Sequence, residues 1–279
     1  MSDKGLVGIR AQICGSCALL LMLAFPARSQ IAQLPERAEQ HHHSGHHMNI
    51  PDEATGTCAP SFTYEEGAQG PSHWEGMCST GRMQSPIDIR LAQKVSMVPL
   101  TLAYQPAALD LVNDCNHRRL VIRFPDNYWL KVGKKPYFLS EIDFHDPGED
   151  AVNGKRPRMA IRFIHLSAEA VFLIIEVPVV AGRENPAFKA LLGNVPEPGK
   201  ENKNEDAMIN AMDFLPADRS YYRFQGSLTI PICNEDVTWL VMKHPIEFSE
   251  AQIAQYEKYY HNTARPLQPL NGRPVAESR

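Results

Sequence analysis

The sequence predicts a mainly β fold with a small amount of α-helix, in which most strands pair antiparallel. A chain of 279 residues with 43% hydrophobic content can bury a full core, as one large domain or two small ones. Short runs of alternating apolar and polar residues recur along the chain, and turn-forming residues separate them at short intervals. Numerous strands joined by short turns favour antiparallel pairing, because parallel strands need long crossover connections.

The first thirty residues have the pattern of an export signal. Lys4 and Arg10 precede an apolar run over residues 17–25, and small residues follow it around Ala27 and Ser29. The run is too short to span a bilayer comfortably, so no membrane span is expected in the mature chain. We therefore predict a signal peptide over residues 1–29 and a secreted or periplasmic protein, with an uncleaved anchor as the alternative.

Residues 30–59 are polar and show no apolar period, which predicts a flexible tether. This stretch is rich in histidine, and imidazole suits zinc and nickel ions. Loose metal binding is one interpretation, and a solvated spacer is the simpler one. The residues concerned are His41, His42, His43, His46 and His47.

The charge balance and the cysteines narrow the class of protein further. With 28 basic and 32 acidic residues and no Lys/Arg block, the chain lacks the cluster of positive charge that is typical of nucleic-acid binding.

Removal of residues 1–29 leaves an even number of cysteines, which in an exported chain favours two disulfides in any of three pairings. These cysteines are Cys58, Cys78, Cys115 and Cys233.

The central part of the chain contains the strand candidates, which are residues 109–112, 120–124, 128–132, 138–144, 159–165 and 170–180. Two helices are expected, over residues 185–192 and 249–260. Ser249 is a candidate N-cap for the second, where Ile253, Tyr256 and Tyr260 fall at helical spacing.

Residues 141–147 carry the most informative polar pattern. In a strand, Glu141, Asp143 and His145 would share one face, because alternate side chains point the same way. Arg162 lies on the strand candidate that follows within hairpin reach. From the residues alone, this group is a metal site, a salt-bridged remnant of one, or a buried polar cluster.

Several motifs resemble those of the alpha-class carbonic anhydrases. The first runs from Gly70-Pro71 through Trp74 to the stretch Cys78 to Ile89, which includes Gln84-Ser85-Pro86-Ile87-Asp88. Further similar segments follow in order as far as Arg273, so the resemblance covers nearly all of the mature chain. It implies a single domain over residues 60–279, built on a large, twisted, mostly antiparallel sheet with a conical active-site cleft.

The resemblance also implies where a catalytic zinc would bind. The three positions of the family's histidine ligands correspond here to Asp143, His145 and Arg162, so only His145 keeps its histidine. A guanidinium group carries donors only and is always protonated, so it cannot ligate a cation. We expect Asp143 and Arg162 to form an ion pair in place of the metal, with no zinc at the core. The family's ligand-orienting positions correspond to Glu141 and Ala160.

Other positions of the family's site are retained. Glu149 and Thr229 match the residues that orient the zinc-bound hydroxide, and His117 lies where the proton-shuttle histidine is expected. Glu149 and Thr229 could instead be structural and hydrogen-bond to each other in a buried network. The walls of the carbon dioxide pocket correspond to apolar residues that would serve equally as core, namely Leu228, Trp239 and Ile164.

The resemblance pairs Cys78 with Cys233, which leaves Cys58 to pair with Cys115. The expected function is that of a carbonic-anhydrase-like domain without carbon dioxide hydration, acting as a binding or scaffold module for a protein or small anion. The alternative is an active zinc-dependent carbonate dehydratase that uses Asp143, His145 and an unforeseen third ligand.

Overall fold

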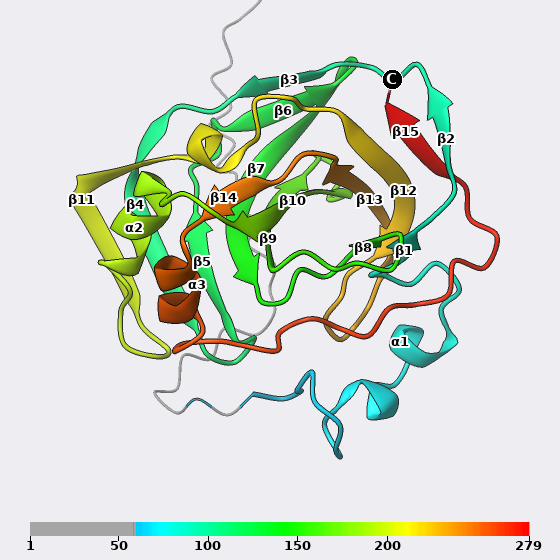
Figure 1. The fold of residues 1–279 in the computed structure, drawn as a ribbon, viewed down its shortest axis with the longest axis horizontal. Helices are drawn as coiled ribbons and strands as arrows, with labels where there is room; N and C mark the ends of the chain where they lie inside the picture. Colours follow the sequence, from blue (N-terminus) through cyan, green and yellow to red (C-terminus); the bar gives the residue numbers. More distant parts are fainter. Residues whose placement is uncertain (1–57, 59, 279) are drawn as a thin grey trace, which may run out of the picture. The chain divides into compact units, whose positions relative to one another are not determined.

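A computed structural model of the protein describes residue 58 and residues 60–278. The predicted signal peptide lies outside these residues, as does the histidine-rich tether except for Cys58. The described part is built mainly from strands, in a mixed sheet of 13 strands and a separate sheet of two (Figure 1). The large sheet has the order β11-β4-β5-β7-β9-β10-β13-β12-β15-β2, with β3, β6 and β14 paired beside this path.

The predicted strands are present, and three of the six are longer than expected. They are β4 (Pro106–Asp114), β5 (Arg119–Arg123), β6 (Trp129–Val132), β7 (Lys135–His145), β9 (Met159–Leu166) and β10 (Phe172–Ala181). Further strands of the large sheet are β2 (Ala92–Val95), β3 (Leu100–Ala103), β11 (Glu201–Asn210), β12 (Tyr221–Ser227), β13 (Glu235–Met242), β14 (Ile246–Phe248) and β15 (Val275–Ser278). Pairing is mostly antiparallel, as predicted, but β10 runs parallel to β13 and β14, and β15 runs parallel to β2.

Both predicted helices form, and each begins at a capping side chain. The Asn185 side chain accepts a hydrogen bond from the Phe188 amide at the start of α2 (Pro186–Leu192). Ser249 and Gln252 form a reciprocal capping box at the start of α3 (Glu250–Tyr256), which ends earlier than the pattern suggested. The two helices contact each other and lie at the β11 end of the sheet (Figure 1).

The two faces of the large sheet have different environments. On one face, side chains such as Phe163 and Ile175 pack with Phe188 of α2 and Tyr256 of α3 in the main hydrophobic core. On the other face lies a smaller apolar cluster around Trp239, and beside it a group of buried charged side chains. Because side chains alternate along a strand, the strands that bury apolar residues against the helices present these charged residues on the opposite face.

A small parallel sheet joins β1 (Asp88–Ile89) to β8 (Ala151–Val152). This pairing places β8, which follows β7 in the chain, beside β1, which lies about ten residues after Cys78. Backbone hydrogen bonds from the Ala151 amide to the Ile87 carbonyl (3.0 Å) and from the Asn153 amide to the Ile89 carbonyl (2.9 Å) complete it.

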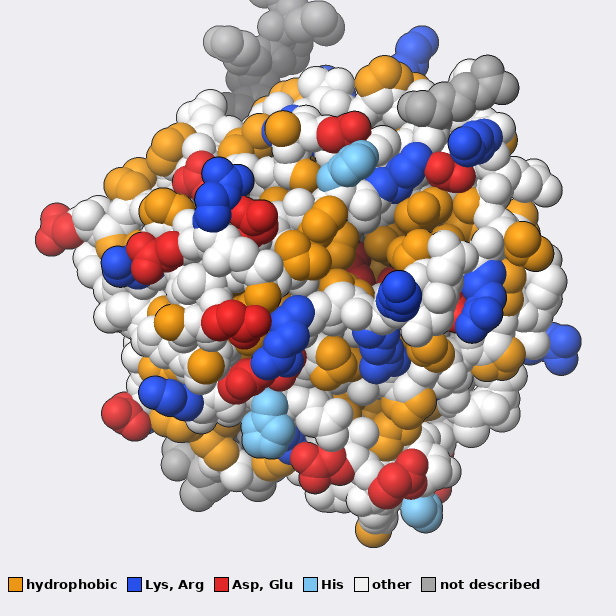
Figure 2. Space-filling model, viewed as in Figure 1, with side chains coloured by type: hydrophobic (Ala, Val, Ile, Leu, Met, Phe, Trp, Pro, Cys, Tyr) orange, Lys and Arg blue, Asp and Glu red, His pale blue; other side chains and the backbone are white. Residues whose placement is uncertain are grey.

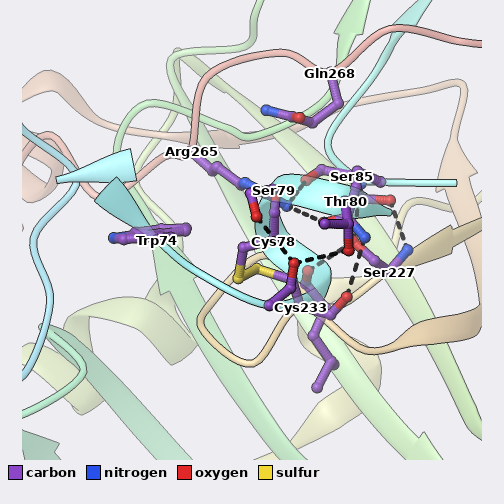
Figure 3. The surroundings of a disulfide bond; sticks show 12 residues. Trp74, Cys78, Ser79, Thr80, Ser85, Ser227, Cys233, Arg265 and Gln268 are labelled. Atoms are coloured by element: carbon purple, nitrogen blue, oxygen red, sulfur yellow. Dashed lines mark hydrogen bonds between the residues drawn. A yellow bond between two sulfur atoms is a disulfide. The ribbon is translucent and has the colours of Figure 1, made fainter. Parts of the chain in front are cut away.

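Two disulfides are present, Cys78 with Cys233 and Cys58 with Cys115, as expected. The first is next to α1 (Met77–Thr80) and lies among buried polar contacts (Figure 3). Arg265 donates to the Cys78 carbonyl (2.9 Å) and the Ser85 carbonyl (3.0 Å), so it connects the C-terminal segment to the N-terminal one. Nowhere in residues 60–278 does a helix have both the length and the apolar character needed to cross a membrane.

Candidate functional site

The charged group on the sheet face is centred on one row of residues across three neighbouring strands. Asp143 of β7 pairs in register with Arg162 of β9, and Arg162 pairs with Glu176 of β10. Residues in register on adjacent strands project from the same face, so these three side chains are neighbours. All three are at most 4% exposed.

The predicted ion pair between Asp143 and Arg162 is present and bidentate. Arg162 Nε donates to Asp143 Oδ1 at 2.8 Å, and Arg162 Nη2 donates to Asp143 Oδ2 at 2.5 Å. Two parallel charge-assisted bonds of this kind fix both side chains in one plane. The guanidinium group of Arg162 therefore lies directly against the Asp143 carboxylate, and the pair joins two of the three positions that the resemblance implies for zinc ligands.

A second guanidinium group, from Arg119 of β5, also contacts Asp143. Arg119 Nη1 donates to Asp143 Oδ2 at 2.8 Å and to Glu141 Oε1 at 2.7 Å. The sequence analysis did not identify Arg119, which immediately precedes the predicted strand over residues 120–124 and lies two residues before the Val121 that pairs with Asp143. The sequence could have shown that this arginine shares a strand face with the buried Val121. It does not show which strand lies beside that face, so the contact with Asp143 could not be predicted.

Arg162 also connects the ion pair to Glu149 and Thr229. Its Nη1 donates to Glu149 Oε2 at 2.7 Å and to Thr229 Oγ1 at 2.8 Å. The threonine hydroxyl in turn donates to Glu149 Oε2 at 2.9 Å. All three side chains are buried. The carboxylate and hydroxyl that match the hydroxide-orienting pair are thus hydrogen-bonded to each other and to a guanidinium group.

The two predicted site histidines have different surroundings. His145 is buried, its Nδ1 donates to the Thr263 carbonyl at 2.7 Å, and its Nε2 lies 3.6 Å from Asp143 Oδ2. His117 is near the surface, where its Nδ1 lies 2.7 Å from Asp114 Oδ2. Because Arg119 Nε donates to the same Asp114 oxygen at 3.3 Å, His117 connects to the edge of the charged group through Asp114.

The predicted pocket walls belong to the smaller apolar cluster. Leu228, Trp239 and Ile164 are all buried there. Trp239 Nε1 donates to the Ser227 carbonyl at 3.0 Å, so the indole is held by the backbone as well as by packing. These residues line the core on the same face as the ion pair.

Two other histidines among the described residues lie away from the charged group. His165 is buried, and its Nε2 lies 2.5 Å from the Tyr104 hydroxyl. His244 is 53% exposed and lies 3.3 Å from Asp218. Neither contacts the charged group.

Charge and burial act in opposite directions on Asp143. Burial alone raises the pKa of a carboxyl group, but the charge and hydrogen bonds of Arg162, together with His145, outweigh it and hold the pKa of Asp143 well below its ordinary value. Burial lowers the pKa of Arg162, but the negative charges of Asp143 and Glu149 raise it by more, so the net pKa lies above its ordinary value. The pair is therefore ionised at neutral pH.

The residues at this site do not fit a zinc ion. Two guanidinium groups hydrogen-bond to Asp143, and both would repel a cation placed among Asp143, His145 and position 162. Zinc in a catalytic site takes three protein ligands and one open position. Within residues 60–278, no three His, Cys, Asp or Glu side chains are grouped so that they could hold a metal ion.

The mainly β architecture and the position of this group on the sheet face define the class of protein as a carbonic-anhydrase-type domain. Residues 69–279 match the family described as eukaryotic-type carbonic anhydrase. The chain belongs to this family.

Named relatives support the assignment at both the sequence and the structural level. A carbonic anhydrase of Klebsiella pneumoniae is 32% identical over 226 residues, covering 78% of this chain and 92% of the relative. One from Nostoc sp. is 35% identical over 224 residues, covering 76% and 84%. The solved alpha-carbonic anhydrase of Photobacterium profundum superposes with a TM-score of 0.73 at 34% identity, covering 77% of this chain and all of that one.

Proposed function

We propose that this protein is a non-hydrating member of the carbonic anhydrase family, which keeps the fold as a binding or scaffold module. The observation that carries the proposal is the bidentate pair of Arg162 with Asp143, because it puts a permanent cation at a zinc-ligand position. Arg119 adds a second cation to the same carboxylate. The two guanidinium groups supply the positive charge that balances the buried carboxylates, so no metal ion is required to neutralise them.

The retained polar residues are consistent with this proposal. Arg162 uses one nitrogen to bind both Glu149 and Thr229, so the pair that would orient a hydroxide is already engaged. An exported protein would fit the two disulfides. The partner would be another protein or a small anion, and the domain's surface would provide the contact.

The experiment is a stopped-flow measurement of carbon dioxide hydration by the purified chain, with and without added zinc. We expect the uncatalysed rate in both conditions, because Arg162 blocks ligation. The Klebsiella pneumoniae carbonic anhydrase serves as the positive control. A zinc-dependent rate above background that a chelator removes would overturn the proposal.

The second candidate function is zinc-dependent hydration with an unusual ligand set. The hydrogen bond from Thr229 to Glu149 favours it, because that contact is the one an active member would need. It requires Arg162 to leave Asp143 and a third ligand to approach His145. If the stopped-flow assay detects catalysis, loss of that catalysis in His145→Ala would establish this alternative.

A further inference from the structure

Three carboxyl groups are buried on this side of the sheet, and each has an oxygen without a hydrogen-bond partner among the described residues. Glu149, Asp150 and Glu176 are each at most 1% exposed. The oxygens concerned are Glu149 Oε1, Asp150 Oδ2 and Glu176 Oε2. A buried carboxylate that lacks hydrogen bonds is destabilising, and proton uptake relieves the cost.

Four cations near this cluster, Arg162, Arg156, Lys243 and Arg273, donate hydrogen bonds to other acceptors. Arg162 donates to Asp143, Glu149 and Thr229 and makes no hydrogen bond to Glu176 among the described residues, although the two residues are in register. Arg156 donates to the Arg265 carbonyl at 2.6 Å, and Lys243 pairs with Glu277 at 2.6 Å. Arg273 donates to the backbone carbonyls of residues 84, 225, 269 and 270. Asp150 and Glu176 are therefore left without a salt-bridge partner within residues 60–278.

Asp150 and Glu176 join the small β1–β8 sheet to the large sheet. The Ile87 amide donates to Asp150 Oδ1 at 2.7 Å, and the Asp150 amide donates to Glu176 Oε1 at 3.2 Å. Ile87 immediately precedes β1, Asp150 immediately precedes β8, and Glu176 is on β10. This pair of contacts thus connects three segments that are distant in sequence.

A cavity of about 260 Å³ lies beside the pair, where β8, β10 and β13 meet. Figure 2 shows this face hollowed near its middle, with acidic side chains visible at depth and Lys or Arg side chains at the rim. Besides Asp150 and Glu176, titratable residues in the cavity wall are Lys155, Arg156, Tyr222 and Lys243. The cavity therefore provides space for water next to the pair.

We infer that Asp150 and Glu176 are a proton-binding pair that holds the β1–β8 sheet against β10, and that loss of the shared proton releases this sheet. One proton on the pair neutralises one of the two carboxyl groups. Two negative charges there would repel each other in a buried site where neither group has a salt-bridge partner among the described residues. The proposal does not depend on whether the domain binds zinc, because neither residue corresponds to a ligand position.

The titration of both groups supports this geometry. Burial raises the pKa of Asp150 to about 7, helped by the charge of Glu149 and opposed by the Ile87 amide, Arg156 and Arg273. Burial also raises the pKa of Glu176, with Asp150 and Glu149 adding to it and Arg162 opposing it. When the sheet is released, the groups return to ordinary values near 4. Between about pH 4 and 7 the closed form therefore holds the extra proton, so rising pH favours release.

The test is amide hydrogen exchange of a peptide covering residues 148–155, followed from pH 5 to 8 and corrected for intrinsic exchange rates. Release coupled to one proton predicts that the protection factor falls roughly tenfold per pH unit wherever the closed form holds the proton and the released form does not. The double variant Asp150→Asn with Glu176→Gln supplies two neutral groups and should remove the slope. Glu205→Gln, at an exposed position, is the matched control and should keep it.

Infrared spectroscopy provides a readout that needs no variant. The wild-type protein should show the carbonyl stretch of a neutral carboxyl group at pH 6, and the double variant Asp150→Asn with Glu176→Gln should lose it. A protection factor that is independent of pH, a slope that survives in the double variant, or absence of the neutral-carboxyl band from the wild type would each overturn the inference.

Discussion

Asp143→Ala is expected to destabilise the protein by roughly 3 to 5 kcal/mol, because it leaves buried arginine charge without its partner. Asp143 accepts from both Arg162 and Arg119, and all three side chains are buried. Arg162 would keep only Glu149 and Thr229, and Arg119 would keep only Glu141 and Asp114. Urea unfolding at pH 7, followed by fluorescence, measures the loss.

The matched control is Asp110→Ala, which removes one of the two carboxylate partners of Arg123 at a partly exposed site and leaves Glu201 as the other. Arg123 Nη2 donates to Asp110 Oδ1 at 2.7 Å, so the bond itself resembles those of Asp143. Solvent can replace the lost partner there, and the expected cost is about 1 kcal/mol or less. Equal costs for the two substitutions would show that water reaches Arg162 and Arg119, which contradicts a buried ion pair.

Restoring histidine at both altered ligand positions should restore zinc binding. The variant Asp143→His with Arg162→His would supply three imidazoles together with His145, which is the ligand number of a catalytic zinc site. Arg119 would remain close and repel the ion. Adding Arg119→Gln should therefore tighten binding by about tenfold or more. Zinc content after equilibrium dialysis, determined by atomic emission, is the measurement.

A control for these variants converts a surface ion pair to histidines in the same way. Asp110→His with Arg123→His adds two imidazoles at a surface site that holds no histidine among the described residues, so it should take up no stoichiometric zinc. If the folded triple variant bound no more zinc than this control, positions 143 and 162 would not mark a former metal site.

The sequence predicted six strands of the large sheet and both helices from local signals, and the ion pair from the resemblance. Alternation over residues 159–165 shows a strand directly, and Ser249 begins its helix through a capping box within the same segment. The pairing of Asp143 with Arg162 followed from a resemblance in which the two positions face each other. These features depend on short stretches or on motif positions.

Features that depend on pairing between segments distant in the chain could not be predicted from the sequence. Strand β11 is mostly polar, with little alternation, and it forms because its backbone pairs with β4 at the sheet edge. Arg119 reaches Asp143 only through the register of β5 on β7. Glu176 was read as part of an apolar strand, and its contact with the Asp150 amide requires two segments 26 residues apart.

The central claim is that the Arg162 guanidinium occupies the place of zinc, and native mass spectrometry tests it most directly. The protein would be incubated with zinc and desalted, both as the full chain and without residues 41–47, whose histidines could add loosely bound metal. We expect the shortened protein to have the mass of the metal-free chain with two disulfides. One zinc per shortened chain, lost in His145→Ala, would contradict the claim.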